Sequence, residues 1–203
     1  MYAIIMDTSN QYLTVGLFQD GKLLSKKQVK ALRQQSELAI PYLEEILSNF
    51  NLELKDVDEM IISIGPGSYT GVRIAMTIAK TLAAVLPIKI KGISSLAMFA
   101  GKQKAISIID ARSHKVYVGI YENGKALQED CLMDLEEFKA FYKQHDDFLL
   151  VGDVELLDQP ARQIDVCENL YQLSLNQPYI EDVDALVPTY IKDVEVKAKC
   201  SKD

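Results

Sequence analysis

Histidine is scarce in this sequence of 203 residues, which contains only His114 and His145. The two lie in different segments, and no HxxxH or HExxH pairing places both on one face of a helix. The sequence therefore argues against a metal site, and we expect both histidines to face solvent.

Cysteine is also scarce, and long apolar runs are absent. The three cysteines, Cys131, Cys167 and Cys200, are an odd number without the spacing of metal ligands. No signal peptide precedes the expected fold, and no apolar span is long enough for a membrane helix. These absences predict a protein of the reducing cytoplasm that does not enter a membrane.

Positive charge is in deficit, with 22 lysines and arginines against 29 acidic residues, a net charge of −7 and a pI near 5.0. Proteins that bind nucleic acid unaided neutralise its phosphates with lysine and arginine. Any contact with RNA is therefore expected to need a partner. A hydrophobic share of 48% is enough for a sizeable core, in one compact domain or two small lobes.

One passage occurs twice, at an offset of 103 residues. IMDTSNQYLTVGLFQDGKLL, starting at Ile5, aligns without a gap to IIDARSHKVYVGIYENGKAL, starting at Ile108. Each copy is an apolar run ending in Asp, a polar turn, an alternating strand, and then Asp-Gly or Asn-Gly, which favours a tight hairpin. We predict two lobes of common ancestry, each opening with a β-meander.

The remainder of the first half alternates helical and strand patterns, which suggests a mixed sheet with covering helices. The expected elements are a helix over 36–50 capped by Ser36, a buried strand over 58–64, a helix over 71–86 ended by Pro87, a strand over 88–91 and a short helix over 94–99.

The second half is less complete. Asp134 with Glu137 predicts a helix start, and a strand is expected over 147–151. Between Gly152 and Val183 the sequence is short and polar, without a second glycine loop or long apolar helix. We divide the chain into an N-terminal lobe, 1–101, and a reduced C-terminal lobe, 102–203, whose last segment is expected to pack back between the lobes.

The segment GPGSYTGVRIA joins a predicted strand to a predicted helix. We select five of its residues as those of a candidate glycine loop: Gly65, Gly67, Ser68, Gly71 and Arg73. Free N–H groups at a helix start can bind phosphate, but the spacing matches neither GxxxxGK[ST] nor GxGxxG. The alternative is structural: the glycines permit a sharp turn and close packing, while Ser68 or Thr70 satisfies the helix start. We favour the structural interpretation.

The helix after this loop is apolar nearly all round. Its bulky stripe is Ile74, Ile78, Leu82 and Val85, and a stripe rich in alanine lies about 100° away. We expect the bulky stripe to face the sheet of its own lobe and the alanine stripe to meet another chain, although the first helix could instead cover it entirely. The predicted partner-binding residues are Tyr42, Leu43, Ile46, Val72, Ala75, Met76, Ala79, Ala83 and Leu86.

Asp7 and Asp110 end equivalent predicted strands and would line a cleft between the lobes. A two-lobed phosphotransferase would hold Mg²⁺ and phosphate there. The turns that follow lack glycine, so a turn-capping role is at least as well supported. The sequence offers no catalytic pair, and we predict neither a catalytic residue nor a bound metal.

Six segments of the sequence are informative when taken together: MDTS, QSELAIPYLEEIL, GPGSYTGVRIA, GISSLAMFA, IDAR and VPTYIK. In combination they resemble the TsaB family, also called YeaZ, over most of the chain. The resemblance implies a duplicated actin-like, ribonuclease-H-like α/β fold and a role in forming threonylcarbamoyladenosine beside the anticodon of tRNAs that read ANN codons.

In that family TsaB is a non-catalytic subunit, TsaD transfers the threonylcarbamoyl group and TsaE is the ATPase. The resemblance therefore implies no cofactor of this chain's own, a heterodimer with TsaD, a ternary complex with TsaE, a homodimer when alone, and contact with tRNA only within the complex. The pairing surface would be the helices at 36–50 and 71–86.

The chain departs from the family pattern in two places: Gln35 replaces a frequent histidine, and Ala75 replaces a common glycine. Two rival functions remain. One is a small ATP-dependent phosphotransferase of the actin-like or sugar-kinase class, acting in the cleft, and the other is a protease.

Overall fold

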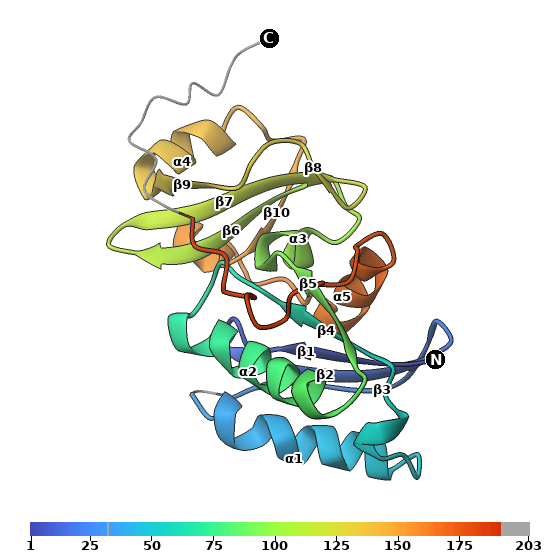
Figure 1. The fold of residues 1–203 in the computed structure, drawn as a ribbon. Coiled ribbons are helices and arrows are strands. Elements are labelled where there is room, and N and C mark those ends of the chain that lie inside the picture. The colour runs from blue at the N-terminus through green and yellow to red at the C-terminus, as the bar shows by residue number, and fades with distance from the viewer. Residues whose placement is uncertain (32, 192–203) are drawn as a thin grey trace.

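The protein is described by a computed structural model that covers residues 1–31 and 33–191. Two β-sheets, each with helices on its faces, form two stacked lobes (Figure 1). The chain begins in the lower lobe of that view, passes to the upper lobe and returns between the two.

The sheet of the first lobe has five strands in the order β3-β2-β1-β4-β5. β1 pairs antiparallel with β2 and parallel with β4. β1 and β4 are buried at nearly every position, because helices cover both faces of the sheet. The strands are β1 (Tyr2–Asp7), β2 (Tyr12–Gln19), β3 (Lys22–Lys30), β4 (Glu59–Ser63) and β5 (Lys89–Ile93).

The sheet of the second lobe has the order β10-β6-β7-β8, with β9 also paired to β7. β6 pairs antiparallel with β7 and parallel with β10, as β1 does with β2 and β4. The strands are β6 (Ala105–Arg112), β7 (Lys115–Glu122), β8 (Lys125–Ala126), β9 (Cys131–Asp134) and β10 (Leu149–Gly152).

This correspondence confirms the duplicated actin-like fold. Both hairpin turns have the expected geometry, with φ of 48° and 87° at Asp20 and Gly21, and of 54° and 77° at Asn123 and Gly124. The second lobe is reduced as predicted: β10 is followed by a short 3-10 helix, Val154–Leu157, where the first lobe has a long helix and then β5. Its third meander strand shrinks to the two residues of β8.

Within residues 1–31 and 33–191, five α-helices cover the sheets, together with a 3-10 turn at Leu54–Asp56. α1 and α2 pack on one face of the first sheet, and α5 packs on the other, against β1, β4 and β5. α3 packs on β6, β7 and β10, and α4 covers the outer face of the second sheet. The helices are α1 (Gln35–Ser48), α2 (Tyr69–Val85), α3 (Ser95–Ala100), α4 (Leu135–Tyr142) and α5 (Val166–Ser174).

The short helices α3 and α5 are exchanged between the halves of the chain. The expected boundary near Gly101 separates the two sheets, but α3 from the first half packs on the second sheet and α5 from the second half packs on the first. Residues 178–191 also return to the first lobe. Residues 192–203, with Cys200, lie outside the described residues.

The helix starts follow from capping residues, with one exception. Ser68 accepts from the Gly71 N–H at the start of α2, and Asp134 accepts from the Glu136 N–H at the start of α4, as their sequences indicated. The expected Ser36 cap is wrong, because Gln34 occupies the N-cap of α1 and Ser36 lies inside the first turn.

Candidate functional site

A cavity of about 820 Å³ lies between the two lobes. From the first lobe it is lined by the hairpin residues Ser9 and Asn10, and by Gly67, Ser68 and Tyr69 at the start of α2. The second lobe contributes both acidic and basic side chains, so the wall carries charges of both signs. These residues are Asp110, Arg112, Asp153 and Glu155.

Asp7 does not face this cavity. Its side chain is fully buried and accepts hydrogen bonds from the Ser63 hydroxyl, the Ser9 N–H at 3.0 Å and the Asn10 amide at 2.8 Å. Burial raises the pKa of Asp7, and the hydrogen bonds from Ser63 and Ser9 act against that rise. Both carboxylate oxygens are thus engaged in holding the turn between β1 and β2.

Asp110 does line the cavity, but it too has local partners. It accepts from the Arg112 backbone N–H at 2.8 Å and from the Arg112 guanidinium at 2.9 Å. The Asp110 N–H in turn donates to Asp153 at 2.8 Å, and burial raises the pKa of Asp153. Asp110 therefore supports the β6–β7 turn, the part that Asp7 takes in the first lobe.

The glycine loop packs directly on the β1–β2 hairpin. A Cβ at Gly71 would lie 2.2 Å from the Thr8 carbonyl oxygen, and one at Gly67 would lie 2.6 Å from that of Ser9. Gly65 has a φ of 99°, which favours glycine. These contacts support the structural interpretation of the loop, because the glycines allow α2 to start in contact with the hairpin.

Hydrogen bonds fix this junction. The Thr8 hydroxyl donates to the Gly71 carbonyl at 2.6 Å and accepts from the Ala75 N–H at 3.1 Å. The Ser68 N–H donates to the Ser9 carbonyl at 2.8 Å. Gln35, at the start of α1, donates from its side-chain amide to the Asn10 carbonyl at 2.9 Å. The hairpin is therefore held by both helices.

Arg73 lies on the side of α2 away from this junction. Its guanidinium stacks on the Tyr69 ring at 3.6 Å from the centroid and lies 5.5 Å from the centroid of Tyr190. It donates to the Tyr69 carbonyl at 2.8 Å and to the Tyr190 hydroxyl. Arg73 was selected from the sequence as a residue of the glycine loop, but its contact with Tyr190 was not predicted.

The expected orientation of α2 is wrong. Val72, Ala75, Met76 and Ala79 are buried within the protomer, as are Leu43 and Ile46 of α1, and only Tyr42, Ala83 and Leu86 are half-buried. The small side chains let α2 lie close to the first sheet and to α1, so Val72, Ala75, Met76 and Ala79 belong to the core of this lobe and are not free to meet another chain.

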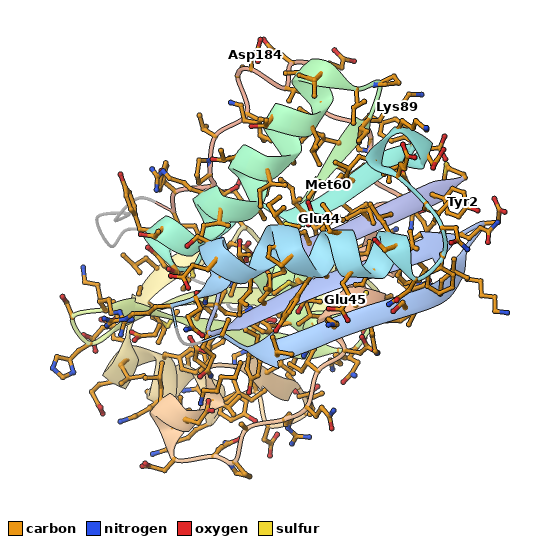
Figure 2. The ribbon with its side chains drawn as sticks, turned by 90° about the horizontal axis from the view of Figure 1, so that it is seen from below. Tyr2, Glu44, Glu45, Met60, Lys89 and Asp184 are labelled. Carbon is orange, nitrogen blue, oxygen red and sulfur yellow. The ribbon has the colours of Figure 1, made fainter. Side chains whose placement is uncertain are left out.

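The bulky stripe is more accessible than the alanine stripe, although Ile74, Ile78 and Leu82 also pack against the core of the first lobe. Ile74, Ile78 and Leu82 are half-buried, and Val85 is 72% exposed. We call these four residues the helical face. Ile40 of α1 and Phe50 beyond its end are exposed as well, and Figure 2 looks onto the layer that α1 and α2 form, with Glu44 and Glu45 on α1. Glu44, Glu45 and Ser48 of α1 are exposed.

The two histidines differ in their surroundings. His114 is exposed as expected, but His145 is half-buried: its ring stacks on Phe141, and Nδ1 is 2.8 Å from the Phe141 carbonyl. Among the described residues, no group of three or more His, Cys, Asp or Glu side chains is arranged to hold a metal ion. Within the same part of the chain, no helix has the length and apolar character needed to cross a membrane.

Comparison with known proteins gives a consistent result. The sequence profile of the TsaD family, described as tRNA N6-adenosine threonylcarbamoyltransferase, matches residues 29–143. The tRNA threonylcarbamoyladenosine biosynthesis protein TsaB of Bacillus subtilis is 30% identical, over 98% of this chain and 97% of its own length. TsaB of Haemophilus influenzae is 32% identical over 66% of this chain and 58% of its own.

The fold has a solved counterpart. The structure titled YeaZ from Pseudomonas aeruginosa matches with a TM-score of 0.73 and 19% identity, covering 94% of this chain and 99% of that one. A second Pseudomonas aeruginosa structure, described as similar to peptidase YEAZ, has a TM-score of 0.76 at the same identity and coverage. At this level of identity the likeness establishes the fold alone.

Proposed function

The chain belongs to the TsaB (YeaZ) family, and from this premise we propose that it is a non-catalytic scaffold subunit in the threonylcarbamoyladenosine modification of ANN-decoding tRNAs. It docks TsaD, helps to assemble TsaE, and forms a homodimer when alone. The modification takes place in the cytoplasm, and ATP is hydrolysed by TsaE. With a net charge of −7, the chain meets tRNA only through the complex.

The helical face is the observation that carries this proposal. Over about three turns of α2, Ile74, Ile78 and Leu82 are half-buried and Val85 is exposed, and Ile40 of α1 is exposed as well. Apolar side chains grouped in this way are typical of a protein–protein contact. The proposed pairing surface is this face together with Ile40 of α1, in place of the buried part of the alanine stripe, so the two helices stay the same.

The surroundings of Asp7 support a non-catalytic role over the rival phosphotransferase. A magnesium ion needs accessible carboxylate oxygens, whereas those of Asp7 are buried and already accept hydrogen bonds from the turn and from Ser63. The space in front of the hairpin is also occupied by Gly67 and Ser68.

The test replaces exposed apolar residues by glutamate. Val85→Glu combined with Ile40→Glu should weaken binding to TsaD by about thirtyfold, because the new carboxylates would be desolvated in the contact. The same double variant should abolish modification in a reconstituted mixture with TsaD, TsaE, ATP and tRNA. Leu127→Glu, at an exposed leucine of the second lobe, is the matched control. If the double variant binds TsaD like the unaltered chain in calorimetry, the helical face is not the docking surface.

A further inference from the structure

Residues 178–191, here called the strap, connect both lobes without forming a helix or strand. In Figure 1 the strap is the red segment that leaves α5 and runs between the lobes. The Ile180 N–H donates to the Ile90 carbonyl at the edge of β5, and the Thr189 N–H donates to the Ile64 carbonyl just beyond β4, both at 2.8 Å. The strap thus crosses the first lobe from β5 to the glycine loop.

Two cations of α2 hold the strap along its length. Lys80 Nζ donates to the carbonyl oxygens of Asp184 at 2.8 Å and Leu186 at 3.1 Å, and Asp184 lies beside α2 in Figure 2. Nearer the start of α2, Arg73 lies between Tyr69 and Tyr190. Because Tyr69 also lines the cavity between the lobes, the strap is joined to the cavity wall through Arg73.

The apolar contacts of the strap divide between the two lobes. Ile180, Val183 and Leu186 pack against the cluster formed by α1, α2 and the first sheet. Ile191 instead packs against a cluster that includes Leu96 of α3 and Ile109 of β6. The chain also passes between the lobes at 101–104 and at 158–165, so the strap forms a third connection. A third connection restricts a relative rotation that two would leave free.

The hold on the strap is nevertheless weak. None of residues 178–191 is buried, and Val187 and Tyr190 are 65% and 54% exposed. Segments with few buried apolar contacts and few backbone hydrogen bonds open locally, well below the free energy of global unfolding. α5, directly before the strap, has a buried apolar face and should stay in place.

We propose that the strap is a releasable clasp. When docked it fixes the angle between the lobes and the width of the cavity, and when released from Arg73 and Lys80 it lets the second lobe move while both sheets stay folded. The device is independent of which molecule the helical face binds.

Hydrogen exchange with mass spectrometry on the full chain tests this proposal. In the double variant Arg73→Ala, Lys80→Ala, peptides from 178–191 should exchange about tenfold faster or more, because the docking contacts of the strap are lost. Peptides at the lobe junction, where the Ser94 hydroxyl donates to Asp130 at 3.0 Å, should also exchange faster, and the radius of gyration from X-ray scattering should rise. Peptides of β1 should not change.

Two further variants make the test decisive. Tyr190→Ala, altered in the strap itself, should reproduce the effect even if changes in α2 disturb that helix. Lys139→Ala removes a surface lysine paired with Glu136 in the second lobe and should change neither region. The proposal is overturned if the strap exchanges only at the rate of global unfolding, or if it opens while the lobe junction and the scattering stay unchanged.

Discussion

The two lobes begin with the same strand-turn-strand passage but build different amounts of structure on it. Each lobe then adds a helix and a parallel strand, α1 and β4 in the first and the 8 residues of α4 and the short β10 in the second. Within the described residues, only the first lobe continues with the glycine loop, the 17 residues of α2 and the fifth strand, β5. The second sheet remains covered because α3, from the first half of the chain, packs on it, and α5, from the second half, packs on the first sheet. A duplicated unit can therefore lose elements in one copy when the copies share their covering helices.

The lobes differ most in their tolerance of charge on a helix. Ala79 of α2 is fully buried, whereas Ala140 of α4 is exposed. Ala79→Glu should destabilise the fold by about 4 kcal/mol or more, because its carboxylate would be buried without a partner. Ala140→Glu should change stability by less than about 0.5 kcal/mol. Urea denaturation compares the two, and equal stabilities would contradict the observed orientation of α2.

The two lobes can be loosened separately through their buried phenylalanines. Phe138→Ala should cost about 3 kcal/mol and expose the apolar cluster beneath α4 without affecting the first sheet. Phe18→Ala should cost a similar amount but also loosen α5, because Phe18 stacks on Tyr171 with ring centroids 4.0 Å apart. Hydrogen exchange of β1, α4 and α5 in each variant distinguishes these patterns. Identical patterns would mean that the lobes unfold as one unit.

Substitution of a glycine in the glycine loop of the first lobe should cause the next largest loss of stability. Gly71→Ala places a Cβ against the Thr8 carbonyl and should lower stability by about 2 kcal/mol, because the start of α2 must move from the hairpin. Gly124→Ala in the second lobe serves as a comparison, since its positive φ strains alanine but its nearest neighbour is the end of the Leu173 side chain. Thermal unfolding should show a loss of melting temperature in both, and a larger loss in Gly71→Ala.

The smallest effect concerns pH and the second lobe. Burial raises the pKa of Asp153, so the folded state keeps its proton at pH values where the unfolded state has lost it. The contribution of Asp153 to stability is therefore present below the unfolded pKa and is lost as the pH rises through the folded pKa. Asp153→Asn can still accept from the Asp110 N–H and should lose this dependence. Urea titrations between pH 3 and 7 give the free energy of unfolding at each pH. The same dependence of that free energy on pH in both proteins would contradict the prediction.

Much of the fold was predictable from local pattern. Both hairpin turns, the cap at Ser68 and the order of strands and helices in the first half follow from residue types at fixed spacings. α5 was missed, although its signal is present: Asp165 caps the helix, and Val166, Leu170 and Leu173 share its buried face. Pro160 and Pro178 interrupt the sequence on either side of this helix, but neither lies within it.

The candidate site was less predictable. The sequence of α2 is apolar on nearly every face, so it does not indicate which face of the helix is exposed. Counting side-chain bulk favoured burying Ile74 and Ile78, yet packing chose the alanines, which bring α2 closer to the sheet and to α1. Likewise, nothing near Arg73 in the sequence pointed to Tyr190, since the two are 117 residues apart.

The amino-acid sequence by itself determined the duplication, the turns and the family, because each depends on residues that are neighbours along the chain or on patterns that recur in it. Tertiary structure alone decided which stripe of α2 faces outward, which lobe each short helix serves, and that the strap joins α2 to the second lobe. These are contacts between segments far apart in the chain, and they are settled by how surfaces fit together.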